Sequence, residues 1–356
     1  MRQTNTELIR QRLLNQRIAE TTFTKPEQVV SYLGAVQAQE YAVSKWSIGL
    51  RANGLVDGDV EKAVNDGRIL RTHALRPTWH FVTPQDIRWI LMLNKPRVMA
   101  GMKARWKQLE LTDKIATRSN NIITKALQGE KQLTRTDLKA PLEKQKINTN
   151  ENRLSHLLMS AELDALICSG PRVGKNFTYM LLDDRAAPTK PSTHDEAISK
   201  LTERYFTSRG PATIHDFAWW SGLTMGDIRK GIEALPNKFI RETIDGKEYF
   251  FIPNDGKIKD KSCTTFLMPD YDEYGISYKD RSALNPHKIQ SLQPNGRWEI
   301  LRVIIADGVM VGGWKPVETK SETNVETHLK VNLTKAQQAS LRKAVKRFKD
   351  FANNVA

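Results

Sequence analysis

Cysteine is scarce in this chain, which contains only Cys168 and Cys263. Two cysteines exclude a disulfide framework and a cysteine-rich zinc site, and they are typical of a reducing compartment. Long hydrophobic runs are also absent, since no stretch approaches the roughly 18 apolar residues of a membrane helix. Residues 1–16 are polar and charged and lack the apolar segment of a signal peptide. We therefore expect a soluble cytoplasmic protein with no membrane partner.

Acidic residues are in deficit, because 40 Asp and Glu face 55 Lys and Arg and leave a formal net charge of +15. An excess of this size favours a polyanionic partner, and nucleic acid is the first candidate. Residues 84–153 are especially basic, with 15 Lys and Arg against 7 Asp and Glu. A basic protein without such a partner is the alternative, because charge alone does not identify a ligand.

A pattern of helices followed by a strand hairpin recurs along the chain. It is clearest near the third quarter, where helical segments 213–220 and 224–235 precede two strand-like runs joined by Asp245-Gly246. Asp-Gly between such runs is a strong hairpin signal. Residues 68–82 also predict two strands, broken at Arg76-Pro77. This order is typical of a winged helix, a helix-turn-helix motif with a β-hairpin wing.

We predict an α+β fold, mainly α, with three tandem winged-helix modules. After about residue 262 the sequence pattern changes to strand-like runs, which predict a small antiparallel β-barrel or sheet. A helix over residues 334–351 is predicted to end the chain. The chain thus divides into four predicted parts, which are residues 1–100, 101–190, 191–258 and 259–356. About 150 residues per domain makes such a division reasonable for 356 residues.

Several sequence features resemble catalytic motifs but do not match them. Residues 170–176 resemble a phosphate loop but are one residue short and lack its Ser or Thr. The seven histidines show no metal-ligand spacing, and no nicotinamide fingerprint is present, so we expect no metal and no cofactor. Asp270, Asp272 and Glu273 offer paired carboxylates for glycosyl chemistry. We favour a structural turn instead, with carboxylates that cap it or pair with Arg281.

Gln37 and Gln39 form the remaining constellation. Glutamines usually lie on solvated helix faces, and residues two apart on a regular helix point about 200° apart. Both reach one site only at a helix end or distortion. The apolar residues 34–36 before them indicate partial burial, and buried amides need partners. Trp79 and His80 lie beside this segment if the first hairpin folds back onto it.

A family resemblance ties these features together. The chain resembles the AlkZ/YcaQ family of winged-helix DNA glycosylases in Gln37-Ala38-Gln39, in LRPTWHFV at 75–82, in GPAT at 210–213 and in DFAWWSG at 216–222. The resemblance extends over nearly the whole chain. It implies three winged helices and a β-barrel that form a basic, C-shaped cleft. The second glutamine matches the AlkZ branch, because the YcaQ branch carries Asp there.

The resemblance also implies the activity. Such an enzyme is a monofunctional glycosylase that removes alkylated, cationic purines from damaged double-stranded DNA, including interstrand crosslinks in the AlkZ branch. Because the cationic base is a good leaving group, no strong acid is required. Gln39 would position the attacking water, and Gln37 would support the water and the cationic sugar. His80 is a third candidate, with a satisfied hairpin histidine as its equal alternative.

Candidate DNA contacts are basic residues near these elements, each of which is individually more often a solvated surface charge. They are Lys45, Arg71, Arg76, Arg229 and Lys230.

The rival function is a non-catalytic winged-helix DNA-binding protein or transcriptional regulator. Three modules in one chain, without an obvious dimer helix, favour a monomer that wraps one lesion. An RNA-binding protein has little support, because no RNA-stacking motif stands out.

Overall fold

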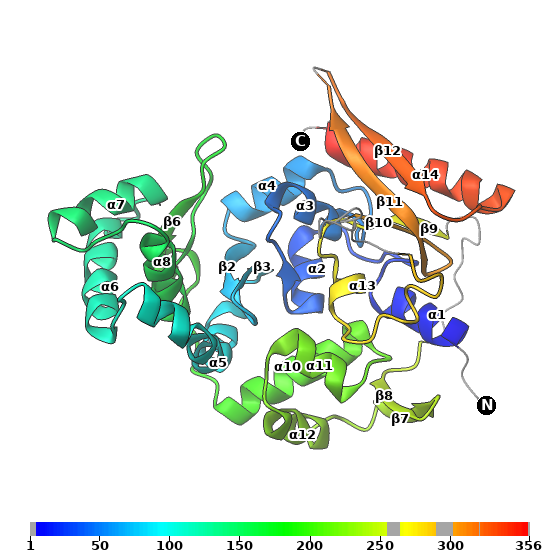
Figure 1. The fold of residues 1–356 in the computed structure, drawn as a ribbon, viewed down its shortest axis with the longest axis horizontal. Helices are drawn as coiled ribbons and strands as arrows, with labels where there is room; N and C mark the ends of the chain where they lie inside the picture. Colours follow the sequence, from blue (N-terminus) through cyan, green and yellow to red (C-terminus); the bar gives the residue numbers. More distant parts are fainter. Residues whose placement is uncertain (1–4, 255–263, 290–301, 320, 355–356) are drawn as a thin grey trace.

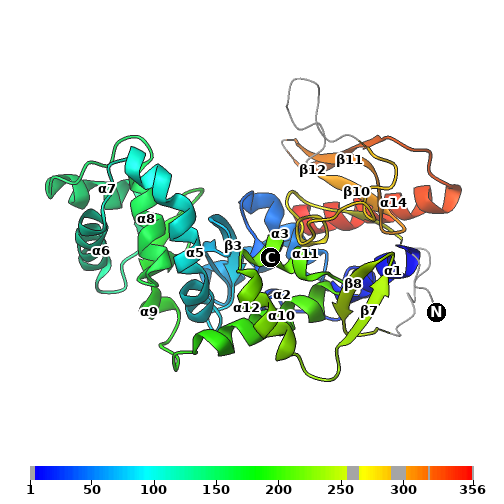
Figure 2. The same ribbon diagram turned by 60° about the horizontal axis from the view of Figure 1, so that its bottom comes forward.

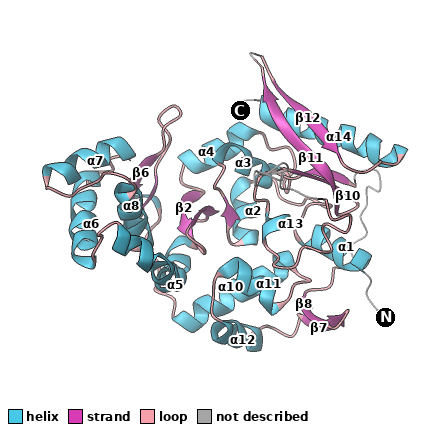
Figure 3. Cartoon of the chain, in the orientation of Figure 1, coloured by secondary structure: helices cyan, strands magenta, loops and turns pink. Residues whose placement is uncertain are grey.

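A computed structural model of the chain describes residues 5–254, 264–289, 302–319 and 321–354. In this part of the chain, helices alternate with small antiparallel sheets (Figures 1 and 3). The predicted α+β class is confirmed. The count of three winged-helix modules and the four domain boundaries stay predictions. None of the described helices is long and apolar enough to cross a membrane.

The first region combines short helices with a three-stranded sheet. Its elements are α1 (Asn5–Asn15), α2 (Pro26–Leu33), β1 (Val36–Gln37), α3 (Tyr41–Gly49), α4 (Asp57–Asn65), β2 (Leu70–Ala74) and β3 (Thr78–Val82). The strand order is β1-β3-β2, and all pairs are antiparallel. Gly34 ends α2 with a φ of +78°, a conformation that favours glycine, and turns the chain into β1. The predicted hairpin over residues 68–82 is confirmed as β2 and β3.

The second region packs against the first sheet through a long helix and a second hairpin. Its elements are α5 (Ile87–Gln108), α6 (Asp113–Leu127), β4 (Leu133–Thr134), α7 (Arg135–Lys144), α8 (Arg153–Leu163), β5 (Ile167–Ser169), β6 (Thr178–Leu181) and α9 (Leu182–Arg185). Strands β4, β6 and β5 form a sheet in that order. The two regions meet where the Arg71 N–H donates to Ser169 Oγ at 2.8 Å.

The third region is the helix-turn-helix and hairpin that the sequence marks best. Its elements are α10 (His194–Arg209), α11 (Ile214–Ser221), α12 (Met225–Glu233), β7 (Ile240–Ile244) and β8 (Lys247–Phe251). Thr213 caps α11 in a reciprocal capping box with Asp216. Asp245 and Gly246 both have positive φ, as a tight hairpin turn demands, and the predicted hairpin is confirmed.

The last region is a sheet covered by the C-terminal helix. Its elements are β9 (Thr265–Leu267), α13 (Glu273–Ile276), β10 (Val303–Ala306), β11 (Val309–Glu318), β12 (Thr323–Leu329) and α14 (Lys335–Asn353). The strands form one four-stranded antiparallel sheet in the order β12-β11-β10-β9. Helix α14 lies along this sheet (Figure 2) and packs Phe348 and Phe351 against Trp46 of the first region.

Two large hydrophobic cores meet at β1. One core runs through the second and third regions and includes Ala35, whereas the other joins the first region to the last and includes Val36 and Ala38. The segment that carries the two glutamines therefore lies at the boundary between the cores. Its backbone is fixed by packing on both sides, which makes it a rigid base for a site.

Candidate active site

The Gln37-Ala38-Gln39 segment is extended rather than helical. Gln37 ends β1 and pairs with His80 of β3, so the first hairpin does fold back onto this segment. The pairing continues beyond the strand, because the Ala38 N–H donates to the Trp79 carbonyl at 2.7 Å. The strand ends at Gln37, and the chain bends at Gln39. The segment is not helical, so the opposed side-chain directions of a regular helix do not apply to the two glutamines.

The two glutamine side chains have different surroundings. Gln37 is buried, and its Oε1 accepts no hydrogen bond from the described residues. Buried acceptors in proteins nearly always have a partner. Gln39 is exposed, and its Oε1 accepts the Trp79 N–H at 3.4 Å, which is long for such a bond. Gln39 is thus the exposed amide of the pair, and Gln37 Oε1 is a buried acceptor without a donor among the described residues.

Arg71 of β2 holds the middle of the motif. Its Nε donates to the Ala38 carbonyl at 3.1 Å, and its guanidinium lies 4.0 Å from the Trp79 ring centroid and 4.6 Å from that of Phe177. Burial lowers the pKa of Arg71 to about 10, so the side chain is still cationic at neutral pH. This predicted phosphate contact is therefore also a support of the motif backbone.

His80 is buried opposite Gln37. Its Nδ1 lies 2.9 Å from the Thr78 carbonyl oxygen, which can only accept, so Nδ1 carries the proton. Burial lowers the pKa of His80 to about 4, and the ring is neutral at pH 7. A neutral imidazole with Nδ1 protonated has an acceptor at Nε2. His80 can therefore contribute an acceptor, but not a cation.

The acidic cluster after β9 has arginine partners, but not the predicted one. Asp270 pairs with Arg302 at 2.7 Å, Asp272 with Arg51 at 2.8 Å and Glu273 with Arg209 at 2.7 Å. The predicted pairing with Arg281 is wrong, since the Arg281 Nε donates to the Tyr278 carbonyl at 3.3 Å. Each arginine is far in the sequence from the carboxylate that it pairs with, and local patterns do not reveal such pairs.

The family can be assigned on the whole chain. A family model described as "DNA glycosylase AlkZ-like" matches residues 30–351. The chain belongs to this AlkZ-like family. A curated relative from Streptomyces sahachiroi, named "Interstrand DNA cross-link repair glycosylase", is 24% identical over 331 residues, which are 86% of this chain and 86% of that protein. The AlkZ-like protein is thus a DNA repair glycosylase that hydrolyses the N-glycosidic bond, and DNA is its partner.

The fold agrees with a solved member of the family. The structure titled "Streptomyces sahachiroi DNA glycosylase AlkZ" covers 100% of this chain and 99% of its own, with a TM-score of 0.80 and 22% identity. At this identity the likeness shows the shared fold. The rival interpretation as a transcriptional regulator is not favoured.

The other predicted DNA contacts of the AlkZ-like protein differ in their exposure to solvent. Lys45 is buried, and its Nζ lies 2.5 Å from Asp57 and 2.9 Å from Glu61, so two carboxylates already compensate its charge. Such a placement favours a structural role for Lys45. Arg229 and Lys230 are exposed on α12. They stay candidates for contact with a phosphate.

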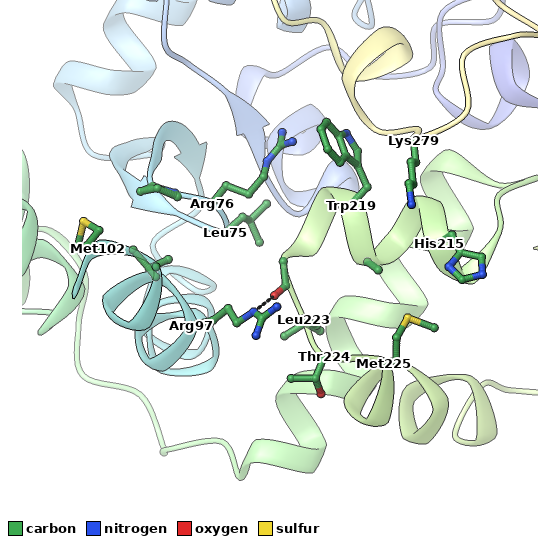
Figure 4. Close-up of a pocket in the computed structure, with 15 residues that line it drawn as sticks. Leu75, Arg76, Arg97, Met102, His215, Trp219, Leu223, Thr224, Met225 and Lys279 are labelled. Atoms are coloured by element: carbon green, nitrogen blue, oxygen red, sulfur yellow. Dashed lines mark hydrogen bonds between the residues drawn. The ribbon is translucent and has the colours of Figure 1, made fainter. Parts of the chain in front are cut away.

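Arg76 lies at the turn between β2 and β3 and faces a cavity of about 630 Å³ between α5 and α11 (Figure 4). Its guanidinium is 5.4 Å from the ring centroid of the exposed Trp219. Burial lowers the pKa of Arg76. Arg97 and Lys279 line the same cavity, which thus has three cationic side chains in its wall.

A second cavity, of about 530 Å³, adjoins the motif through Trp79. It lies between the first and second regions, and its walls combine cations, aromatic rings and hydroxyl groups. The lining residues are Arg71, Trp79, Thr134, Arg135, Thr136, Ser169, Asn176, Phe177, Thr178 and Tyr179. Sequence reasoning missed Phe177 and Tyr179 as site neighbours. Their approach to Trp79 depends on how the first and second regions pack, which local sequence does not reveal.

Within the described residues, no group of three or more His, Cys, Asp or Glu is arranged to hold a metal ion. Cys168 is buried, and burial raises the pKa of its thiol, which disfavours the reactive thiolate. Cys263 lies outside the described residues. The groups at the motif are thus two amide side chains, a neutral imidazole, the Arg71 guanidinium and the Glu273 carboxylate, which accepts the Gln37 N–H at 3.0 Å.

Proposed function

We propose that this glycosylase excises cationic N7- or N3-alkylated purines from double-stranded DNA, with the attacking water held at Gln37 and Gln39. The observation that carries the proposal is the Gln37 Oε1, a buried acceptor for which the described residues supply no donor. Gln39 supplies a second, exposed amide oxygen one residue beyond Ala38. A water molecule has two hydrogens to donate and suits such a pair of acceptors.

The reaction requires no proton transfer from these side chains to the leaving base. The C–N bond breaks with its electron pair moving to the positively charged base, which leaves neutral, and the sugar becomes an oxocarbenium-like cation. Water then attacks the sugar and releases its proton to solvent. Amide oxygens orient the water and present the negative ends of their dipoles to the cation. Preorganised groups of this kind contribute several kcal/mol to catalysis.

The proposed preference for cationic bases follows from the groups around the motif. A neutral base needs a general acid to protonate it as it leaves. Glu273 is ionised, because Arg209 offsets the effect of burial on its pKa, and His80 is neutral at pH 7. A glutamine side chain does not exchange protons at this pH. Neutral, undamaged bases should therefore be poor substrates.

We assign the cavity beside Trp79 to the lesion side of the bound duplex and the cations near Trp219 to the DNA backbone. Arg76, Arg97 and Lys279 around the first cavity offer three positive charges for phosphates. Arg229 and Lys230 lie on α12, which follows α11 after a short turn. In a helix-turn-helix motif, the second helix is the one that enters the DNA groove. We propose a monomer, since these groups all come from one chain.

Interstrand crosslinks are a second candidate substrate. The curated Streptomyces relative is named for crosslink repair, and this chain covers 86% of it. The cavity of about 530 Å³ next to Gln39 offers room beside the reacting sugar for a bulky adduct. A crosslinked N7-alkylguanine carries the same positive charge as a methylated base, so the same chemistry applies.

The test is base release from a duplex that holds a single N7-methylguanine, measured under single turnover with wild type and Gln39→Ala. Loss of one preorganised polar group is expected to slow excision about 100-fold. Gln85→Ala, which truncates an exposed glutamine in another segment, is the matched control and should excise at the wild-type rate. Equal rates for all three proteins would overturn the role of the motif. A crosslinked duplex in the same assay decides on the second substrate.

A further inference from the structure

Strand β1 has one edge that no strand of the described residues covers. In the order β1-β3-β2, its inner edge pairs with β3, and residues of the third and last regions contact its other side. The residues of this segment, from Leu33 to Ala38, are all buried. Buried backbone groups need hydrogen-bond partners as much as side chains do. The outer edge must therefore be satisfied by something other than a sheet.

A buried ion pair supplies those partners. The Arg209 Nη1 donates to the Leu33 carbonyl at 2.7 Å, and its Nη2 donates to the Ala35 carbonyl at 2.9 Å. The Gln37 N–H donates to the Glu273 Oε1 at 3.0 Å. The Leu33 carbonyl lies at the end of α2, where a helix leaves its last carbonyls unpaired, and Ala35 and Gln37 are alternate residues of the stretch that leads into β1. The ion pair thus ties the end of α2 to the free edge of β1.

The pair itself is rigidly held. Arg209 and Glu273 are fully buried, and the Glu273 Oε2 accepts from Arg209 Nη2 at 2.7 Å, from Trp220 Nε1 at 2.9 Å and from Ser277 Oγ at 2.7 Å. The Arg209 guanidinium also lies 4.2 Å from the Trp220 ring centroid. Two other parts of the fold, α11 and α13, therefore fix the ion pair, and through it the strand.

We propose that Arg209 and Glu273 are positioning residues of the glycosylase, which hold the Gln37 backbone where its side-chain oxygen meets the attacking water. The inference rests on the proposed function of Gln37. Neither side chain touches substrate; each acts through the strand. A displacement of about 1 Å at a reacting group can reduce a rate about 100-fold, so a strand that shifts slightly is costly.

The chain contains a matched pair for comparison. Asp272, the neighbour of Glu273, accepts two hydrogen bonds of 2.8 Å from the equally buried Arg51. Arg51 also donates to backbone and side-chain oxygens of Gln16 and to the Ser47 carbonyl, none of which belongs to the motif segment. The two pairs thus share their chemistry and burial and differ in contact with β1.

The experiment compares Arg209→Lys with Arg51→Lys. Lysine keeps the positive charge beside the carboxylate, but its single ammonium cannot hold the carboxylate and two carbonyls in the same geometry. Under single turnover on the methylated duplex, Arg209→Lys should lose at least about 30-fold in excision rate with duplex affinity within about threefold. Arg51→Lys should stay within about threefold of wild type in both.

Hydrogen exchange gives a readout that does not depend on activity. Amide exchange in a peptide that spans residues 33–38 should accelerate in Arg209→Lys and stay at the wild-type rate in Arg51→Lys. If Arg209→Lys does not fold, Glu273→Asp takes its place, since it keeps the charge but withdraws the carboxylate from the Gln37 N–H by one methylene. Faster exchange with unchanged excision would overturn the proposal, and so would an equal loss of rate in both lysine variants.

The result also separates this inference from the proposed function. If Gln37→Ala excises as fast as wild type, the proposed catalytic role of Gln37 is overturned, and the positioning role of Arg209 and Glu273 is overturned with it. If Gln37→Ala is slow while Arg209→Lys is as fast as wild type, only the positioning role is overturned.

Discussion

The β2–β3 and β7–β8 hairpins both follow helical segments and look alike in the sequence, yet they differ in burial and in strand partners. Every residue of β2 is buried, and β3 gains a further partner in β1. The β7–β8 hairpin is a two-stranded sheet, and four of the five residues of β7 are not buried. Strand β8 is buried at Tyr249, Phe250 and Phe251. The first hairpin is thus buried over more of its length, whereas the second packs β8 on the core and exposes β7.

This difference decides what each hairpin can do. A buried hairpin fixes its side chains and backbone in one arrangement, because each polar group must find a partner there. It can therefore orient Gln37 and His80 within a fraction of an ångström. An exposed hairpin leaves its side chains hydrated and adaptable, which suits contact with a charged backbone but not catalysis. The comparison can be tested at single positions.

The largest contrast is expected from truncation of one hydrophobic side chain in each hairpin. Phe81 in β3 is fully buried and contacts Tyr41, whereas Ile240 in β7 is 38% exposed. Phe81→Ala should lower the free energy of unfolding by about 3 to 5 kcal/mol, because it leaves a cavity. Ile240→Ala should cost less than about 1 kcal/mol. Urea unfolding followed by circular dichroism measures both, and similar losses would contradict the contrast.

A smaller effect is expected from the pH dependence of stability. The pKa of His80 is about 4 in the folded chain against an ordinary 6.5, so between these pH values the unfolded chain binds a proton that the folded chain does not. Stability from this residue is therefore complete above pH 6.5 and falls by up to about 3 kcal/mol as the pH drops to 4.

Substitution separates His80 from the other titrating groups. In His80→Gln, the decline in unfolding free energy between pH 6.5 and 4 should become shallower than in wild type. The control is His215→Gln, which removes an exposed histidine of α11 and should leave the wild-type slope unchanged. A wild-type slope in His80→Gln would show that His80 is not held neutral by the fold.

The sequence predicted both hairpins because their signals are local. Asp245-Gly246 and the break at Arg76-Pro77 determine turns from neighbouring residues alone. It did not predict β1, since a strand of two residues exists only through its pairing with His80 and Phe81, some 40 residues away. Long-range pairing leaves no periodic trace in so short a segment.

The site was predicted unevenly for a similar reason. His80 pairs with Gln37 and Trp79 contacts Gln39, as the folding back of the first hairpin predicted, whereas the catalytic roles stay predictions. Arg209 and Glu273 were not recognised as neighbours of the motif, because contacts between residues 174 or more positions apart depend on how the regions pack. Lys45 looked like any surface cation, although Asp57 and Glu61 neutralise it.

The smallest expected effect concerns the solvent-facing region. Arg229 and Lys230 lie exposed on α12, and the Lys230 Nζ is 3.5 Å from the similarly exposed Asp195 carboxylate. If both contact phosphates, the double variant Arg229→Gln/Lys230→Gln should bind undamaged duplex a few-fold more weakly, with the slope of log K against log salt reduced by about 2.

Excision by this variant at saturating protein should match wild type, since the two residues lie on α12 and not on the elements that carry the motif. Titration of a fluorescent duplex at several salt concentrations gives the slope, and Lys45→Gln serves as the control. Because Lys45 is already paired with two carboxylates, its loss should lower stability but leave the salt slope as it is. A reduced slope in Lys45→Gln with none in the double variant would contradict this assignment, because it would place the DNA backbone at α3 rather than at α12.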